Sequence, residues 1–411
     1  MSFKPSNIEK IHIADLRLGM YVCKLDRDWL DTPFIMQGFL IEDREDIDIV
    51  AEYCEFVFID KSETRKTPSG PSSNVGTASS ARTPRYAYQT DINAEHKQMY
   101  KTFREARSVT RGLLENIRLG EAINTSQAKE TVHDCVQSII RHPDALLWMS
   151  RIREQREYTA EHCLNVCILA IAFGRQLDFS EQELENIGMC GLLHDVGKMR
   201  VPIEIVDKPG PLTTKEFRMM KAHTVHGRNL LMSTSGLYGG AIDVAYSHHE
   251  RIDGEGYPRK LPGSGISYYS KLISIVDAYD AMTADRCYDA AKTSTEALKI
   301  IYAERGAQFD EKLALKFIQT IGLYPAGSIV ELYNGNVGII IEANTRYRHL
   351  PRLILVLDEN KKPLKKEKII DLSLIEAGEL PKLFLIKQVW KDGSFGVQLR
   401  EFQKKGLVLK H

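Results

Sequence analysis

Six of the twelve histidines in this chain lie between residues 162 and 249, on or beside stretches with a helical apolar pattern. The most informative pair is His194-Asp195, which ends one such apolar stretch. Neither side chain stabilises a protein core without a partner. A metal ion is such a partner, because imidazole supplies one nitrogen and a carboxylate can bridge two cations with its two oxygens. The pair therefore indicates a metal site.

Further ligands must come from other helices, because one helix cannot surround an ion. The candidates are His162, His223, His248, His249 and Asp277. With His194 and Asp195 they give five imidazoles and two carboxylates, which suits two ions bridged by one carboxylate better than one ion. His226 is predicted to be an ordinary histidine, since His223 already fills the ligand role.

The alternative interpretation treats each of these residues separately. A single helical histidine is more often a satisfied core or surface group than a ligand, and Asp277 alone could be a plain helix residue. That interpretation needs five separately satisfied histidines and two unpaired carboxylates, so the joint occurrence favours metal binding. Gly197 would let the backbone turn sharply after Asp195, and Lys198 would direct a cation into the same pocket.

The elements that must position these residues are mainly helical. The fold class is predicted to be mainly α, with a helical catalytic domain between two strand-rich parts. The predicted segments are a small strand-rich module over 1–61, a flexible Ser/Thr/Pro/Gly-rich linker over 62–92, connecting helices over 93–150, the catalytic domain over 151–322 and a strand-rich segment over 323–411. Asn334-Gly335 predicts a hairpin, and Thr213 with Glu216 predicts a capping box.

Composition excludes several functions. Lys plus Arg equals Asp plus Glu, at 55 each, so no global charge attracts the chain to DNA, RNA or an anionic membrane. No apolar stretch approaches the roughly 20 residues that span a bilayer, and the N-terminus lacks an apolar export segment. Seven scattered cysteines without a CxxC pair fit a reducing compartment. We expect a cytoplasmic protein. Cys163 and Cys167, four apart, are predicted to be buried core residues.

Residues 158–290 resemble an HD-GYP domain, a subgroup of the HD superfamily of metal-dependent phosphohydrolases. The matching blocks are His194-Asp195-Val-Gly-Lys198, Lys208-Pro-Gly-Pro-Leu-Thr, His223-Thr, His248-His249-Glu250-Arg251-Ile-Asp253-Gly254-Glu-Gly256-Tyr257-Pro258 and Asp277-Ala-Tyr-Asp280-Ala-Met-Thr-Ala-Asp285-Arg286. Their order and spacing match the family throughout the domain. The N-terminal part resembles an uncharacterised module that often precedes HD-GYP domains.

The resemblance implies a ligand set. The first metal would be held by residues matching His162, His194, Asp195 and Asp277, and the second by Asp195, His223, His248 and His249. It favours iron or manganese, although ligand chemistry alone also admits zinc. A third ion, which some members bind through a Glu, is not expected because Tyr158 occupies that position.

The resemblance also implies the reaction, which is hydrolysis of cyclic di-GMP to pGpG and onward to GMP. A hydroxide formed from a water bridging the two metals would attack phosphorus in line. Asp195 and Lys198 are the predicted catalytic residues, with Lys198 stabilising a phosphoryl oxygen or holding the nucleophile. Substrate contacts are predicted for Arg286 and for the loop residues Gly256, Tyr257 and Pro258, where two glycines would let backbone amides approach the ligand.

Three residues depart from the family pattern: Asp289 stands where a basic residue is common, Ile252 where Trp is common and Lys260 where Gly is common. These departures bear on the guanine contacts and on the choice of substrate. The alternatives are therefore a hydrolase preferring 3'3'-cyclic GMP-AMP, a cyclic-dinucleotide receptor without useful turnover, and a phosphohydrolase acting on mononucleotides. The block from His248 to Pro258 argues against the last. No nucleic-acid polymer or membrane is an expected partner; a second copy of the chain or a signalling protein is.

Overall fold

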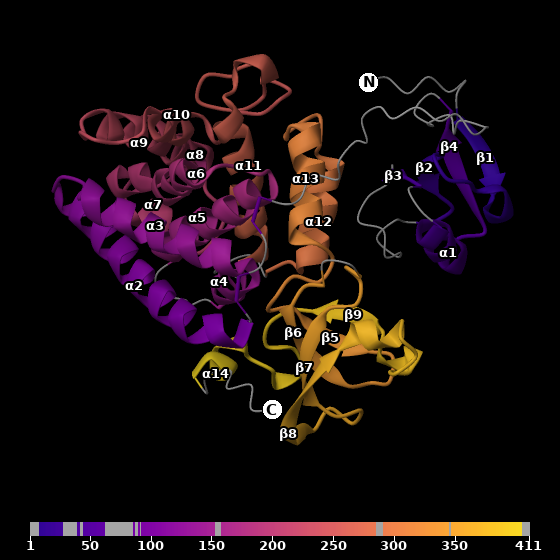
Figure 1. Cartoon of the computed structure of the whole chain (residues 1–411). Coiled ribbons are helices and arrows are strands. Elements are labelled where there is room, and N and C mark those ends of the chain that lie inside the picture. The colour runs from indigo at the N-terminus through magenta and orange to yellow at the C-terminus, as the bar shows by residue number, and fades with distance from the viewer. Residues whose placement is uncertain are drawn as a thin grey trace. The chain divides into compact units, whose positions relative to one another are not determined.

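The computed structural model describes residues 8–27, 39–41, 44–61, 85–86, 89–90, 92–152, 158–284, 291–344 and 347–404. These residues form two compact units that divide between Thr83 and Pro84. The first unit holds the predicted strand-rich module, and the second holds the helices together with the C-terminal strands (Figure 1).

The first unit is a four-stranded antiparallel sheet with one helix, in strand order β1-β4-β2-β3. Its elements are β1 (Ile8–His12), β2 (Tyr21–Leu25), β3 (Phe39–Leu40), α1 (Arg44–Tyr53) and β4 (Phe56–Asp60). Val57 and Ile59 of β4 are buried, whereas Phe56 and Phe58 are half-buried, as expected for a strand with one core face. The strand-rich prediction is confirmed, but α1 was not predicted. Asp46-Ile-Asp-Ile alternates like a strand, and that pattern hid the helix.

The second unit contains the long helices and a five-stranded sheet. Its helices are α2 (Ile92–Leu119), α3 (Thr125–Arg141), α4 (Pro143–Ser150), α5 (Tyr158–Gln176), α6 (Glu181–Leu193), α7 (Ile203–Val206), α8 (Thr214–Lys221), α9 (His223–Met232), α10 (Gly239–Ser247), α11 (Tyr268–Thr283), α12 (Ser294–Ala303), α13 (Glu311–Ile321) and α14 (Leu399–Lys404). A short 3-10 helix, η4 (Val196–Arg200), follows α6. The mainly helical fold class is confirmed.

Helix α5 is the centre of the helical part. It packs against α2, α3, α4, α6, α11 and α13. Nearly all of its middle is buried, including Cys163 and Cys167, so the prediction that these two thiols are core residues is confirmed. The backbones of α5 and α6 approach closely at Gly191, where an added Cβ would lie 2.8 Å from the Cα of Cys167. Glycine at this position therefore sets the spacing of the two helices.

Local signals fix where several helices begin. The predicted capping box is present, because the Thr213 hydroxyl accepts from the Glu216 N–H and the Glu216 carboxylate accepts from the Thr213 N–H. Ser180 and Glu183 form another at the start of α6. Val132, Cys135, Val136, Ile139 and Ile140 follow a helical spacing, and all five are buried along α3.

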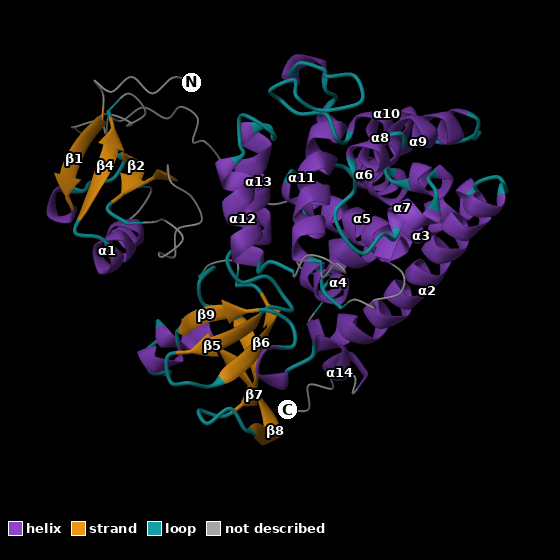
Figure 2. Ribbon diagram, turned by 180° about the vertical axis from the view of Figure 1, so that it is seen from behind, coloured by secondary structure: helices purple, strands orange, loops and turns teal. Residues whose placement is uncertain are grey.

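The C-terminal strands form an antiparallel sheet in the order β8-β7-β6-β5-β9, seen below the helices in Figure 2. Its strands are β5 (Ile329–Leu332), β6 (Val337–Glu342), β7 (Arg352–Leu357), β8 (Pro363–Asp371) and β9 (Ile386–Trp390). Asn334-Gly335 joins β5 to β6, as predicted, and Gly335 has a φ of 87°. One face of the sheet, with Ile339 and Ile341, joins the helical core beside Leu146 of α4.

The predicted linker over 62–92 lies mostly outside the described residues. Its end does not behave as expected of a flexible segment. The Tyr86 hydroxyl donates to the carbonyl of Phe179 at 2.9 Å, and Arg175 of α5 donates to the carbonyl of Tyr86 at 2.9 Å. The helical unit therefore begins earlier than residue 93.

Among the described residues, none of the helices combines the length and the apolar character that crossing a bilayer requires.

Candidate metal centre

The seven predicted ligands, although spread over 116 positions of the sequence, come together at the ends and inner faces of five helices. They are supplied by α5 (His162), the residues that follow α6 (His194 and Asp195), the start of α9 (His223), the residues that follow α10 (His248 and His249) and α11 (Asp277). His162, His194, Asp195, His223 and His248 are each at most 1% exposed, while His249 is half-buried. The sequence thus predicted the convergence, and the metal-binding role remains a proposal.

The seven side chains separate into two groups whose possible ligand atoms lie within 4.8 Å of one another. His162, His194 and Asp277 form the first group. Asp195, His223, His248 and His249 form the second group. This division matches the two sets expected from the family resemblance, with Asp195 placed between them.

The carboxylate of Asp195 faces both groups. Its Oδ2 lies 3.5 Å from Nε2 of His162 and 3.3 Å from Nε2 of His194. Its Oδ1 lies 3.3 Å from Nε2 of His223 and 3.8 Å from Nε2 of His248. One oxygen is thus available to each group, which is the arrangement that a bridging carboxylate requires.

Hydrogen bonds on the outer nitrogens orient the imidazoles. Nδ1 of His194, His223 and His248 lies 2.7, 2.8 and 3.0 Å from the backbone carbonyls of Gly191, Met220 and Val244 respectively. A carbonyl can only accept, so each Nδ1 carries the proton and each Nε2 presents a lone pair to the interior. This is the tautomer that metal-binding histidines use.

The residues fit a cation at this place. Nε2 of His194 and Oδ1 of Asp195 are buried and have no hydrogen-bond partner among the described residues. Nε2 of His223 and Nε2 of His248 lie 3.3 Å apart. Because both present lone pairs, their approach is unfavourable unless a cation neutralises it. Buried unsatisfied acceptors that point at one another are what metal ions satisfy in proteins.

Burial and charge set the protonation states of the site. Burial, with the neighbouring cation of Lys198, lowers the pKa of His223 to about 3 and that of His249 to about 4. Burial opposes ionisation of Asp195, but Lys198 and His194 hold its pKa well below the usual value. Neutral imidazoles and an ionised carboxylate are the forms that bind metals.

Asp280 is a part of the site to which the sequence assigned no role. Its Oδ2 lies 2.7 Å from Nδ1 of His162, and it is 1% exposed. Against burial, hydrogen bonds to Asp277 and Asp280 raise the pKa of His162 to about 9, so binding of a metal at Nε2 would release a proton. The spacing was a usable signal, because residues three apart share a helix face and Asp277 was already a candidate.

Two glycines act differently from the expectation. Gly197 was expected to allow a sharp turn, but it lies within η4, where an added Cβ would be 1.9 Å from the carbonyl oxygen of His223. Gly256 was expected to let an amide approach a ligand, but it is buried, and its Cβ would lie 2.4 Å from the Arg251 nitrogen. Both glycines permit close backbone packing.

The predicted substrate loop lies beside the second group. The ring of Tyr257 stacks on His249, with centroids 4.7 Å apart and an interplanar angle of 27°. Pro258 follows it through a cis peptide bond. Contacts of Gly256, Tyr257 and Pro258 with substrate remain predictions. Arg286 and Asp289 lie outside the described residues, as does the side chain of Tyr158.

Glu250 holds this loop, a role the sequence did not reveal. The carboxylate is 3% exposed and accepts from the backbone N–H groups of Arg259 at 2.7 Å and Leu261 at 2.9 Å. Lys260, between them, has a φ of 55°. This left-handed conformation explains why glycine is common there, and the buried carboxylate stabilises it around a lysine.

Lys198 contacts the bridging carboxylate directly. Its Nζ donates to Oδ2 of Asp195, and its side chain is 19% exposed. The predicted direction of this side chain toward the site is confirmed. Its catalytic role stays a prediction.

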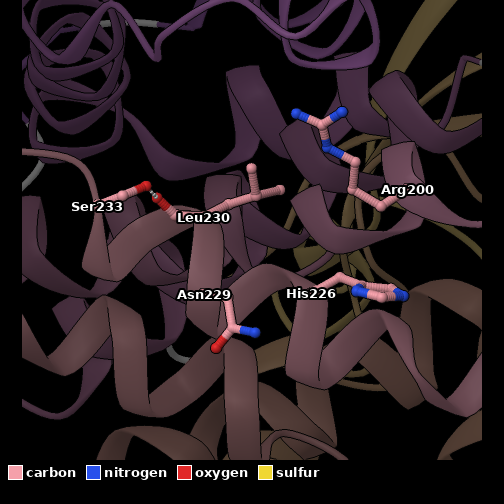
Figure 3. A pocket seen from close by; sticks show the side chains of 5 residues that line it. All are labelled: Arg200, His226, Asn229, Leu230 and Ser233. Carbon is pink, nitrogen blue, oxygen red and sulfur yellow. Dashed lines mark hydrogen bonds between the residues drawn. The ribbon is translucent and has the colours of Figure 1, made fainter.

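A separate pocket of about 370 Å³ lies along η4 and α9 (Figure 3). Its lining side chains are Arg200, His226, Asn229, Leu230 and Ser233. None of the seven predicted ligands lines it, and His226 belongs to neither group of predicted ligands. A further group lies on α3 and α6, where His133 and Glu181 are exposed and Glu185 is half-buried.

Comparison with known proteins assigns both parts of the chain. Residues 140–313 match an HD domain, and residues 8–128 match a domain of unknown function (DUF3391). The chain is 32% identical to the cyclic di-GMP phosphodiesterase PA4108 of Pseudomonas aeruginosa, over 92% of this chain and 91% of that protein.

Two other relatives match a shorter stretch of the chain. The chain is 36% identical to the cyclic di-GMP phosphodiesterase response regulator RpfG of Xanthomonas campestris, over 40% of this chain and 45% of that protein. It is 33% identical to the 3'3'-cGAMP-specific phosphodiesterase 3 of Vibrio cholerae, over 41% of this chain and 36% of that protein. HD domain phosphohydrolases are metal-dependent, and the paired His/Asp groups are consistent with that chemistry. The chain therefore belongs to the HD-GYP family of the HD superfamily, with a DUF3391 module ahead of its HD domain.

Proposed function

We propose that this protein is a phosphodiesterase that hydrolyses cyclic di-GMP at a centre of two divalent metal ions. The first ion is held by His162, His194, Asp195 and Asp277, and the second by Asp195, His223, His248 and His249. Iron and manganese are the preferred metals, because mixed imidazole and carboxylate ligands suit them and the family uses them; zinc is compatible with the same ligands.

One observation carries the proposal. The two oxygens of Asp195 face different groups of imidazoles, and the unprotonated Nε2 atoms of His194, His223 and His248 point inward. The Lys198 ammonium is one cation beside this buried carboxylate, and the inward-facing neutral acceptors around it favour further cations in the same space. Two ions on either side of Asp195 would satisfy all of these atoms together.

The ions, when bound, would supply Lewis-acid stabilisation of phosphoryl charge and make water more acidic. The protein's own part is positional and electrostatic. Asp195 stays ionised, and the Lys198 ammonium beside it adds a positive charge at the edge of the site. Lys198 would stabilise a non-bridging phosphoryl oxygen, or hold the attacking water. The ring of Tyr257 stacks on His249 and borders the site on that side.

The products follow from the bonds broken. Water attacks one phosphorus, the P–O3' bond breaks, and the 3'-oxygen receives a proton. This opens cyclic di-GMP to pGpG, with a 5'-phosphate and a 3'-hydroxyl, and a second hydrolysis would yield GMP.

A second candidate substrate is 3'3'-cyclic GMP-AMP. It is favoured by the similarity of this chain, over 41% of its length, to the Vibrio cholerae enzyme named for that substrate. Both dinucleotides present the same phosphodiesters to the metal centre, so the bases must decide the preference. A non-catalytic receptor is the alternative from another functional class.

The test is purification without oxygen, measurement of bound metal, and turnover of both dinucleotides with added iron or manganese. We expect two ions per chain and faster hydrolysis of cyclic di-GMP. Chelation with EDTA should abolish turnover, and added metal should restore it. Binding without hydrolysis by the metal-loaded protein would favour the receptor, and faster hydrolysis of the mixed dinucleotide would favour the second substrate.

A further inference from the structure

Helix α8 (Thr214–Lys221) has an unusual position in the second unit. It has no buried residue, and it packs against α7 and α9. Phe217 on this helix is 47% exposed. A single exposed phenylalanine is common on protein surfaces and does not by itself indicate a function. The contacts of Phe217 with neighbouring side chains, however, connect it to the metal centre.

Phe217 extends an aromatic surface that begins at the metal centre. The ring of His249 stacks on Tyr257 with centroids 4.7 Å apart. The ring of Phe217 meets Tyr257 edge-on, at 6.5 Å and an interplanar angle of 76°. Three rings, His249, Tyr257 and Phe217, therefore lead from a predicted ligand to the solvent-exposed edge of the site, and we name them the aromatic wall.

Lys221 places a cation on this wall. Its Nζ lies 5.1 Å from the centroid of Phe217 and 5.5 Å from that of Tyr257. A lysine at this distance is attracted to the faces of both rings. Among the described residues, no carboxylate forms an ion pair with Lys221, so its positive charge is available to an anionic ligand at this edge of the site.

Helix α8 is anchored at both ends, so the wall has a defined place. Glu216 closes the capping box with Thr213, and its carboxylate also accepts from Lys208 at 2.6 Å. At the other end, the carbonyl of Met220 accepts from Nδ1 of His223. The last turn of α8 is therefore tied directly to a predicted metal ligand.

We infer that Phe217 and Lys221 form a nucleotide subsite, in which Phe217 stacks against one guanine of the cyclic dinucleotide and Lys221 faces its phosphate. This inference rests on the proposed function and names the residues that would bind the base. Aromatic side chains stack on bases of any identity, and a nearby cation suits the phosphate. The wall would therefore strengthen binding of both dinucleotides without choosing between them.

The test compares steady-state kinetics of four variants with those of the metal-loaded wild type, on cyclic di-GMP and on 3'3'-cyclic GMP-AMP. Phe217→Ala should raise KM about tenfold for both dinucleotides and leave kcat within about twofold. Phe217→Trp should keep KM near the wild-type value. Lys221→Met should raise KM severalfold at low salt, and the effect should shrink at high salt as charge is screened.

Met219→Ala is the matched control, since Met219 is 38% exposed on the same helix and is not part of the aromatic wall. Metal content and melting temperature should be unchanged in all four variants. An unchanged KM for Phe217→Ala, a fall in kcat alone, or an equal effect of Met219→Ala would each overturn the inference.

Measurements on the wild-type protein test the proposed function independently of the variants. If the metal-loaded wild type binds cyclic di-GMP without hydrolysing it, the proposed function fails, and the ratio of dissociation constants for Phe217→Ala and wild type still tests the subsite. If the wild type binds neither dinucleotide, both the proposed function and the subsite are refuted.

Discussion

Gly197 and His223 are in direct backbone contact, close enough that a Cβ on residue 197 would lie 1.9 Å from the His223 carbonyl oxygen. The same Cβ would lie 2.4 Å from the nitrogen of Gly227, so two successive turns on one face of α9 block the added methyl group. Gly197 therefore sets the distance between the segment that carries Asp195 and the helix that begins with His223.

The first prediction is that Gly197→Ala disrupts the second ligand group. The methyl group must displace α9, which we expect to cost about 1–3 kcal/mol of unfolding free energy. A shift of His223 by about 1 Å should lower turnover by roughly 100-fold. Metal analysis should show loss of one of two ions. Gly112→Ala in α2 is the control, because nothing lies within 4 Å of its Cβ; equal damage by both changes would refute the explanation.

The second prediction separates the bridging carboxylate from a carboxylate of one group. Asp195→Asn should remove both ions, because its two oxygens face both groups. Asp277→Asn should remove the first ion alone, since Asp277 belongs to the first group. Both variants should lose turnover by about 100-fold or more. Asp134→Asn, exposed on α3, should change neither quantity. Retention of two ions by Asp195→Asn would exclude the bridging role.

Much of this site could be predicted because metal binding depends on the types of residue present, which the sequence shows directly. The pair His194-Asp195 is unusual at the end of an apolar helix and therefore drew attention to the site. The other five candidates are histidines and a carboxylate whose spacing matches the HD-GYP family. Positions that depend on packing were harder to predict. Gly197 and Gly256 were correctly singled out, but as turn and loop residues, since sequence does not show which backbone segments will touch.

In the fold, too, local features could be predicted from the sequence, whereas tertiary contacts could not. The capping box at Thr213 and the hairpin at Asn334-Gly335 are local signals, and both were correctly predicted. By contrast, Phe217 and Tyr257 are far apart in the sequence, and their edge-on contact is a tertiary one that no local pattern reports. The joining of the C-terminal sheet to the core of α4 is likewise a tertiary contact, and no local pattern reports it.

The third prediction concerns Glu250, which holds the predicted substrate loop. Glu250→Gln replaces one carboxylate oxygen by an amide group, which would face a backbone N–H as a second donor. We expect a loss of about 1–3 kcal/mol of unfolding free energy and a rise in KM of roughly tenfold, because the turn at Lys260 loses its support. Kinetics on cyclic di-GMP and thermal unfolding measure both effects. Glu255→Gln, exposed on the same loop, is the control.

A further variant tests whether Glu250 acts by supporting the turn at Lys260. Lys260→Gly removes the left-handed strain at a φ of 55° and should stabilise the protein by about 0.5–1 kcal/mol. In the double variant Glu250→Gln/Lys260→Gly, part of the lost stability should return. A double variant no more stable than Glu250→Gln would show that Glu250 does not act by supporting this turn.

The last prediction concerns pH and the contact between α4 and the C-terminal sheet. Asp144 is 6% exposed, and Oδ2 accepts from the N–H of Ala343 at 3.1 Å. Burial raises its pKa to about 6, although His142 and the Ala343 N–H act in the opposite direction. Between the unfolded value of 3.8 and the folded value, the folded chain binds more protons. Stability from this residue is therefore full at low pH and lost as the pH rises through about 6.

Asp144→Asn should remove this pH dependence. Relative to wild type, the variant should gain about 1–3 kcal/mol of unfolding free energy between pH 4.5 and pH 7.5, because asparagine can still accept the N–H without a buried charge. Denaturant unfolding at both pH values measures the difference, with Asp134→Asn as the exposed control. If the difference between Asp144→Asn and wild type is the same at both pH values, the carboxyl of Asp144 is already ionised throughout that range. The hydrogen bond to Ala343 would then be the whole of its contribution to the contact.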